Sequence, residues 1–101
     1  MVRHIVCWNY KDNFSNVENE QNGAIIKERL ENLKSKIDGI ISIKVCNHPL
    51  ASSNCDIMLS CLFESQEALD AYQVHEEHVK VASFIKRVTM NRYCIDYIEE
   101  Q

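Results

Sequence analysis

The order of the elements is clearest in residues 55–98, CDIMLSCLFESQEALDAYQVHEEHVKVASFIKRVTMNRYCIDYI. Alternate positions of residues 55–63 are apolar, which is typical of a strand with one buried face. Two helical patterns follow, over residues 65–72 and 76–86, and apolar side chains recur in the second at steps of three and four. Residues 88–98 alternate again. This half of the chain therefore predicts a strand, two helices and a final strand.

The N-terminal half adds two strands and one helix. Residues 2–10 and 40–47 are rich in β-forming residues, and a loop of turn formers at 48–54 precedes the next strand. With a helical pattern over about residues 15–36, the full order is β-α-β-β-α-β. Right-handed crossovers then predict an α+β fold of the ferredoxin-like type, a four-stranded antiparallel sheet with helices on one face.

Local signals set the expected limits of the first helix. Ser15 and Glu18 have the spacing of a capping box, which favours a helix start at this point. Gly23 has a low helix propensity, so we expect the regular helix to begin nearer Ala24. Gly39 follows the last helical turn and predicts its end.

The composition restricts the class of protein. The chain has 101 residues, of which 46% are hydrophobic, so we expect one domain with a buried core. The net charge is −4 and no basic stripe is present, so neither nucleic acid nor a membrane is an expected partner. No apolar run approaches the roughly 20 residues that cross a bilayer, and no signal peptide is evident, which predicts a cytoplasmic protein. The five cysteines have no zinc-type spacing and are expected to be reduced.

Four segments resemble the stress-responsive α/β-barrel (Dabb) domain family. They are VRHIVCWNYKD at 2–12, IDGI at 37–40, FESQEALDAYQVHEEHVKVASFIK at 63–86 and YCIDY at 93–97. The resemblance covers nearly the whole chain and implies a single domain over residues 1–101. It also implies a homodimer in which two sheets pack into a barrel. The half-apolar outer face of the predicted strand at 55–63 agrees, because such a face favours coverage by a second subunit.

The stretch YQVHEEHV, residues 72–79, carries the candidates for chemistry. His78 lies on the apolar stripe of its helix and titrates near neutrality, as a general base requires. Tyr72 ends the preceding helix, where its phenol can polarise a carbonyl or stabilise an enolate. His4 and Asp96 are expected side by side on adjacent strands, with Asp96 fixing the tautomer of His4.

The resemblance implies the same residues. The family includes a plant polyketide cyclase in which a tyrosine and a histidine close a linear polyketide by an aldol condensation, and they match Tyr72 and His78. A histidine and an aspartate of that enzyme match His4 and Asp96. The other residues expected in a pocket between sheet and helices are Val6, Trp8, Leu30, Ile57, Leu59 and Arg92. Leu30 and Ile57 replace polar pocket residues of the cyclase, and Arg92 adds a charge, so a pocket of different polarity is expected.

Several alternatives stay open. The polar residues also suit a structural cluster in a non-catalytic stress-response or ligand-binding protein, and dimeric monooxygenases share this fold. Arg92 is either a surface residue whose stem packs on the sheet or an anion anchor in the pocket. A metal site on His75 and His78 is not expected, because His75 is better placed as a helix cap. The proposed acid–base chemistry requires no cofactor.

Overall fold

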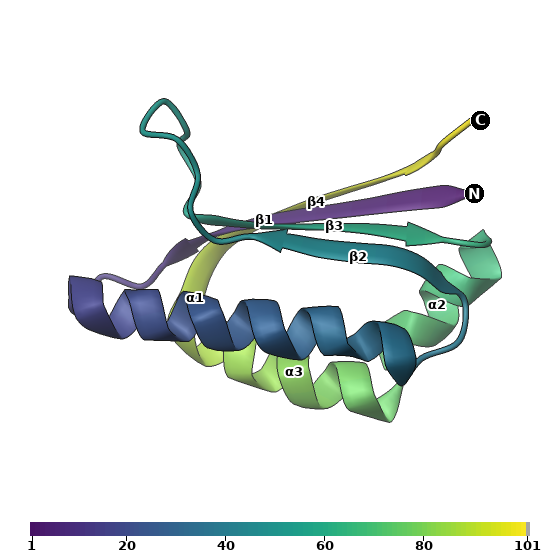
Figure 1. Cartoon of the computed structure of the whole chain (residues 1–101), viewed down its shortest axis with the longest axis horizontal. Helices are drawn as coiled ribbons and strands as arrows, with labels where there is room; N and C mark the ends of the chain where they lie inside the picture. Colours follow the sequence, from purple (N-terminus) through teal and green to yellow (C-terminus); the bar gives the residue numbers. More distant parts are fainter. Residues whose placement is uncertain (101) are drawn as a thin grey trace.

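A four-stranded antiparallel sheet carries all its helices on one face in the computed structural model, which describes residues 1–100 (Figure 1). The strand order is β2-β3-β1-β4. The predicted α+β, ferredoxin-like order is therefore confirmed. The elements are β1 (Val2–Tyr10), α1 (Asn16–Glu31), the 3-10 turn η1 (Asn32–Ser35), β2 (Ile40–Cys46), β3 (Ile57–Phe63), α2 (Gln66–Val74), α3 (Glu76–Val88) and β4 (Thr89–Ile98).

Helix α1 begins at its capping box and not at Ala24, so that expectation was wrong. The Ser15 hydroxyl accepts a hydrogen bond from the Glu18 N–H, and the Glu18 carboxylate accepts one from the Ser15 N–H. Gly23 lies inside the helix, where a Cβ atom would be 2.2 Å from the Tyr10 hydroxyl oxygen. Glycine thus leaves room for the Tyr10 side chain at a position that helix propensity alone disfavours.

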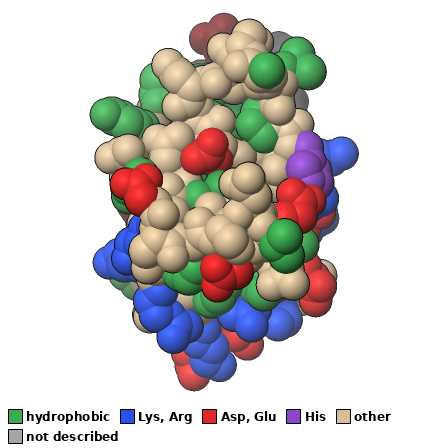
Figure 2. Space-filling model, turned by 90° about the vertical axis from the view of Figure 1, so that its left-hand side faces the viewer, with side chains coloured by type: hydrophobic (Ala, Val, Ile, Leu, Met, Phe, Trp, Pro, Cys, Tyr) green, Lys and Arg blue, Asp and Glu red, His purple; other side chains and the backbone are tan. Residues whose placement is uncertain are grey.

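The core lies between the sheet and the helical layer. Every second side chain of β3 is buried toward the helices, in agreement with the alternation of the sequence. Helices α1 and α3 cover this face, and Figure 2 shows Lys and Arg side chains gathered at the helical end of the molecule. The core includes Val6, Ile26, Leu30, Leu33, Ile57, Leu59, Phe63, Leu69, Val81 and Ile85. Among the described residues, no helix is long and apolar enough to cross a membrane.

A β-bulge interrupts the pairing of β1 with β4. Trp8 of β1 lies opposite two residues of β4, Asn91 and Arg92. Asn91 has a φ of 54°, in the left-handed region that asparagine adopts more readily than most residues. Because side chains alternate along a strand, the extra residue shifts the phase of β4 and turns Arg92 and Asp96 to the helix side.

No helix of residues 1–100 lies over the opposite face of the sheet (Figure 1). Three large β4 side chains are exposed there, with exposed fractions of 74% for Tyr93, 59% for Ile95 and 43% for Tyr97. Ile5 pairs with Ile95 on the neighbouring strand and is half-buried. The outer face thus has an apolar patch on β1 and β4 that is open to solvent in the single chain.

Candidate functional site

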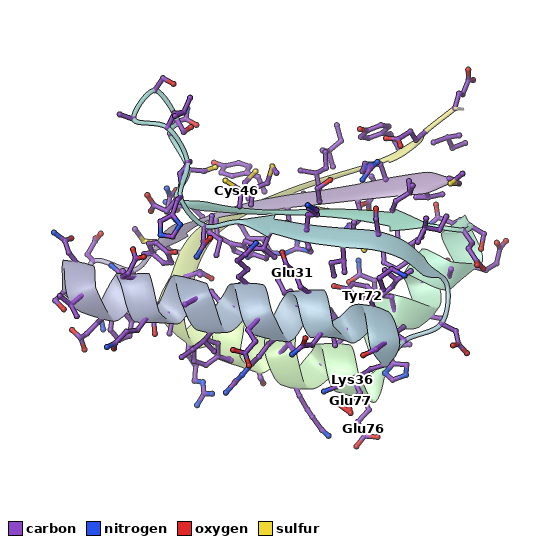
Figure 3. All side chains as sticks on the ribbon, viewed as in Figure 1. Glu31, Lys36, Cys46, Tyr72, Glu76 and Glu77 are labelled. Atoms are coloured by element: carbon purple, nitrogen blue, oxygen red, sulfur yellow. The ribbon has the colours of Figure 1, made fainter. Side chains whose placement is uncertain are left out.

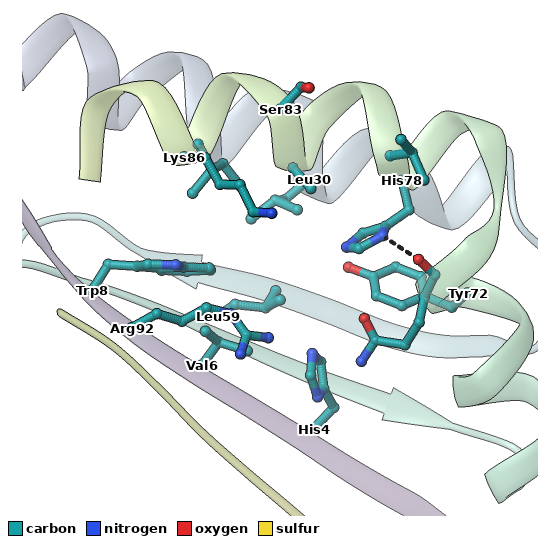
Figure 4. A pocket seen from close by; sticks show the side chains of 14 residues that line it. His4, Val6, Trp8, Leu30, Leu59, Tyr72, His78, Ser83, Lys86 and Arg92 are labelled. Atoms are coloured by element: carbon teal, nitrogen blue, oxygen red, sulfur yellow. Dashed lines mark hydrogen bonds between the residues drawn. The ribbon is translucent and has the colours of Figure 1, made fainter. Parts of the chain in front are cut away.

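A cavity of about 450 Å³ lies between the sheet and helices α2 and α3. Its size is within the range of pockets that hold small molecules, roughly 300–1,000 Å³. Figure 4 shows side chains of β1 and β4 on one wall and side chains of α3 on the other. The predicted site residues that line it are His4, Val6, Trp8, Leu30, Leu59, Tyr72, His78 and Arg92.

Two predicted site residues lie outside the lining. Ile57 of β3 is fully buried in the core and does not line the cavity. Asp96 does not line it either, but its carboxylate accepts a hydrogen bond from His4, with 2.5 Å between Oδ1 and Nδ1.

His78 enters the cavity at the junction of α2 and α3. The last carbonyl groups of a helix lack partners in the helix itself, and here Gln73 O lies 3.2 Å from His78 Nδ1. A carbonyl can only accept, so Nδ1 carries the proton and Nε2 keeps its lone pair. Burial lowers the pKa of His78 below its usual value, the Gln73 carbonyl opposes that change, and the charge of Arg92 is among the groups that add to it. The imidazole is therefore neutral near pH 7, as a general base must be.

Tyr72 lies directly beside this imidazole. The two ring centroids are 4.2 Å apart with the planes tilted by 41°. The Tyr72 side chain is fully buried, yet its hydroxyl has no hydrogen-bond partner among residues 1–100. Burial raises the pKa of Tyr72 well above its usual value, the Cys61 thiol adds to this, and Arg92 opposes it. The phenol therefore keeps its proton and presents an unused donor to the cavity, and Figure 3 shows it between the sheet and the helices.

The pair of His4 and Asp96 supports this end of the cavity. Their register across β1 and β4 places the residues opposite each other. Since the carboxylate accepts from Nδ1, the Nε2 of His4 is unprotonated in the neutral ring. His4 is almost fully buried, and its ring meets that of Tyr72 edge-on with centroids 6.1 Å apart.

The same corner contains a possible set of metal ligands. The ligand atoms of His4, Cys94 and Asp96 all lie within 4.8 Å of one another. However, two ligands of one tetrahedral zinc ion are separated by about 3.3 Å, given zinc–ligand distances of about 2.0 Å. The 2.5 Å between His4 Nδ1 and Asp96 Oδ1 is a direct hydrogen bond, so the geometry is that of a hydrogen-bonded cluster.

His75 does not enter the cavity, and its predicted role is confirmed. It is the N-cap of α3, and its Nδ1 accepts a hydrogen bond from the Glu77 N–H at 3.1 Å. Because the chain breaks between α2 and α3 at this residue, the Tyr72 and His78 side chains both line the cavity.

Residues 2–99 match the family model of the stress responsive A/B barrel domain, Dabb. The chain belongs to the Dabb family. The resemblance of the four sequence segments to this family is thereby confirmed. No match was found among curated proteins.

Several solved structures share the fold of this Dabb chain. A dimeric protein of unknown function from Bacteroides fragilis has 28% identity and a TM-score of 0.88, covering 95% of this chain and 93% of that one. The At3g17210 protein of Arabidopsis thaliana has 21% identity and a TM-score of 0.80, over 100% and 97% of the two chains. A hydroxynitrile lyase from Passiflora edulis has 17% identity and a TM-score of 0.78, over 99% and 94%. The last two likenesses show the fold alone.

The Dabb chain also lines its cavity with polar residues that the sequence analysis missed, namely Gln73, Ser83 and Lys86. Lys86 follows His78 by eight residues, and Ala82 lies midway between them. Residues four apart lie on one helix face, so the spacing from His78 through Ala82 to Lys86 could have predicted that Lys86 faces the cavity.

Proposed function

We propose that this Dabb protein is a cofactor-free acid–base enzyme that acts on a carbonyl compound with an acidic C–H bond. The observation that carries the proposal is the pairing of a neutral imidazole with a buried, unpartnered phenol in one cavity. Buried polar groups are normally hydrogen-bonded, so an unused donor beside a free base suits a ligand that completes both.

Each residue has a distinct role in the proposed reaction. His78 Nε2 takes the proton from the carbon next to the carbonyl, and the C–H electron pair moves into the new C=C bond. The carbonyl π electrons move to oxygen, and the Tyr72 hydroxyl donates a hydrogen bond to the resulting enolate oxygen. The enolate carbon then recovers a proton from protonated His78, or it attacks a second carbonyl. In the second case the π electrons of that carbonyl move to its oxygen, and the resulting alkoxide takes the proton from His78. His4 and Asp96 hold the floor of the site in place beneath Tyr72.

The active form in this proposal is a homodimer. The Bacteroides fragilis relative, 28% identical, is dimeric and has a ferredoxin-like fold. The open apolar outer face of the sheet, with Tyr93, Ile95 and Tyr97 exposed, suits the same face of a second copy. Packing of two such sheets face to face gives the α/β barrel implied by the family description.

Proton exchange tests the acid–base roles. A neutral β-keto ester with one exchangeable C–H is incubated in D2O, and the loss of its proton signal is followed by NMR. We expect His78→Asn and Tyr72→Phe each to slow the protein-dependent exchange by about 100-fold or more, because each removes one catalytic group. The matched control His48→Asn changes an exposed histidine outside the cavity and should exchange at the wild-type rate.

Two results would contradict the proposal. Equal exchange rates in His78→Asn and wild type would remove His78 as the base. No exchange above buffer with the wild-type protein would favour the alternative, a non-catalytic ligand-binding protein that uses the same cavity.

A further inference from the structure

We infer that the cavity binds an elongated, partly apolar ligand that carries a carboxylate, and that Arg92 and Lys86 hold this anion. The inference rests on the proposed function in one respect, since it names the substrate class of the same site. Figure 4 shows the charged groups of Lys86 and Arg92 between Trp8 and the Tyr72–His78 pair. The anion and the reacting carbonyl would therefore be separate groups of one ligand.

The backbone of β4 directs Arg92 into this position. The bulge opposite Trp8 places Asn91 in the left-handed region, and the extra residue turns Arg92 to the helix side of the sheet. Arg92 consequently lines the cavity, and its charge acts on Tyr72 and His78 in the same cavity. Bulges commonly change the direction of side chains beside functional sites, whereas an arginine that only covers the sheet surface does not require a bulge.

The charge balance of the cavity is one-sided. Arg92 and Lys86 bring two cations to the lining, and no lining residue in the described chain is Asp or Glu. The other arginine of the sheet, Arg3, shows the contrast, because Glu99 neutralises it with an oxygen 2.7 Å from its guanidinium. Among residues 1–100, neither Arg92 nor Lys86 has a carboxylate partner. An uncompensated cation pair in a protein of net charge −4 is suited to an anionic ligand.

The shape of the cavity adds the apolar part of the ligand. Trp8, Leu30 and Leu59 are almost fully buried and form its apolar wall. Along α3, the backbone of Lys86 is eight residues beyond that of His78, and the Lys86 side chain extends back toward His78 (Figure 4). A carboxylate at Lys86 and Arg92 can thus belong to the same ligand as a carbonyl at Tyr72, with the apolar body of the ligand against Trp8, Leu30 and Leu59. The unpartnered Tyr72 hydroxyl at the inner end is an independent sign that a ligand fills this space.

A matched pair of probes tests the inference. We would measure binding of phenylbutanoate and of its primary amide by calorimetry on the whole protein, since the two differ mainly in charge. We expect the carboxylate to bind about tenfold more tightly or better, the effect of one charge-assisted hydrogen bond. Arg92→Gln should abolish this preference, and Lys86→Gln should reduce it. The control Lys80→Gln removes a lysine of the same helix that pairs with Glu77 outside the cavity, and it should retain the full preference.

Three outcomes would overturn the inference: equal binding of both probes by wild type, no binding of the carboxylate at millimolar concentration, or an unchanged preference in Arg92→Gln. Arg92 and Lys86 are both exposed at the cavity mouth, so thermal unfolding should confirm that the variants are folded. The result is separable from the acid–base proposal. If His78 does no chemistry, the carboxylate preference persists without proton exchange; if the anion site is absent, exchange of the neutral β-keto ester still depends on His78.

Discussion

The two faces of the sheet are built from the same strands yet have opposite chemistry. The face toward the helices is buried, but it contains the polar pair His4–Asp96 and the unpartnered hydroxyl of Tyr72 above it. The outer face is exposed, but it presents Tyr93 and Ile95 to solvent. A polar cluster within an apolar core and an apolar patch on the surface both depart from the usual distribution.

The difference between the two faces indicates which face binds a ligand and which binds a partner chain. Buried polar groups without partners indicate a site that a small molecule completes, because leaving them unpaired costs free energy. Exposed apolar groups in a contiguous patch indicate a surface that another protein covers. The inner face therefore indicates a bound ligand and the outer face a second chain. Because alternate residues of one strand lie on opposite faces, mutations at such positions can test ligand binding and dimerisation separately.

The largest expected effect is on the inner face. Leu59→Ala removes a buried side chain and should lower the free energy of unfolding by about 2–5 kcal/mol, at any protein concentration. Leu62→Ala is the matched change on the outer face of the same strand. We expect its cost to be smaller and to depend on protein concentration, since it acts through the dimer. Denaturant unfolding at two concentrations measures both, and equal, concentration-independent costs would show that the faces do not differ.

A charge on the outer face tests the comparison directly. Ile95→Lys places an unpaired ammonium in the proposed interface, where its desolvation opposes association. We expect the mass from light scattering at micromolar concentration to fall from that of a dimer to that of a monomer. The control Leu50→Lys introduces the same charge in the exposed loop before β3 and should remain dimeric. A monomeric wild type would end the dimer proposal.

The bulge decides which β4 residues belong to which face, so it offers a third test. Asn91→Val puts a β-branched residue at a φ of 54° and should cost about 1–2 kcal/mol of stability. Asn91→Gly, which tolerates that conformation, should cost little. We also expect the valine variant to lose part of the preference for phenylbutanoate over its amide, because Arg92 is no longer held toward the cavity. An unaffected preference would show that Arg92 finds its position without the bulge.

Sequence patterns were sufficient for the elements and for most of the cavity lining. Alternation in β3 and the helical stripe of α3 depend only on neighbours in the chain, and they identified Leu59 and His78 correctly as inward-facing positions. The cap at His75 was equally local, because its side chain bonds an N–H only two residues away.

The features that were missed depend on contacts between distant segments. The start of α1 was placed too late because the capping box at Ser15 and Glu18 sets the start despite the low propensity of Gly23, which lies beside Tyr10 of the distant strand β1. Ile57 was expected in the cavity, but neighbouring side chains cover it completely. The bulge could not be anticipated, since it arises from the alignment of β1 with a strand some 80 positions later in the chain. Lys86 was overlooked because a lysine on a helix is usually solvated.

The smallest expected effect comes from the titration of His78. Burial lowers the pKa of this imidazole in the folded protein below its value of about 6.5 in the unfolded chain, so the unfolded state binds more protons as the pH falls through 6.5. The His78 contribution is therefore favourable above pH 6.5 and is lost as the pH falls toward the folded pKa. We expect His78→Gln to lose less stability than wild type between pH 7 and pH 5 in denaturant unfolding. If the free energy of unfolding of wild type and His78→Gln changed in parallel with pH, the imidazole would be as hydrated as an exposed one. The inner face would then contain no buried, neutral base.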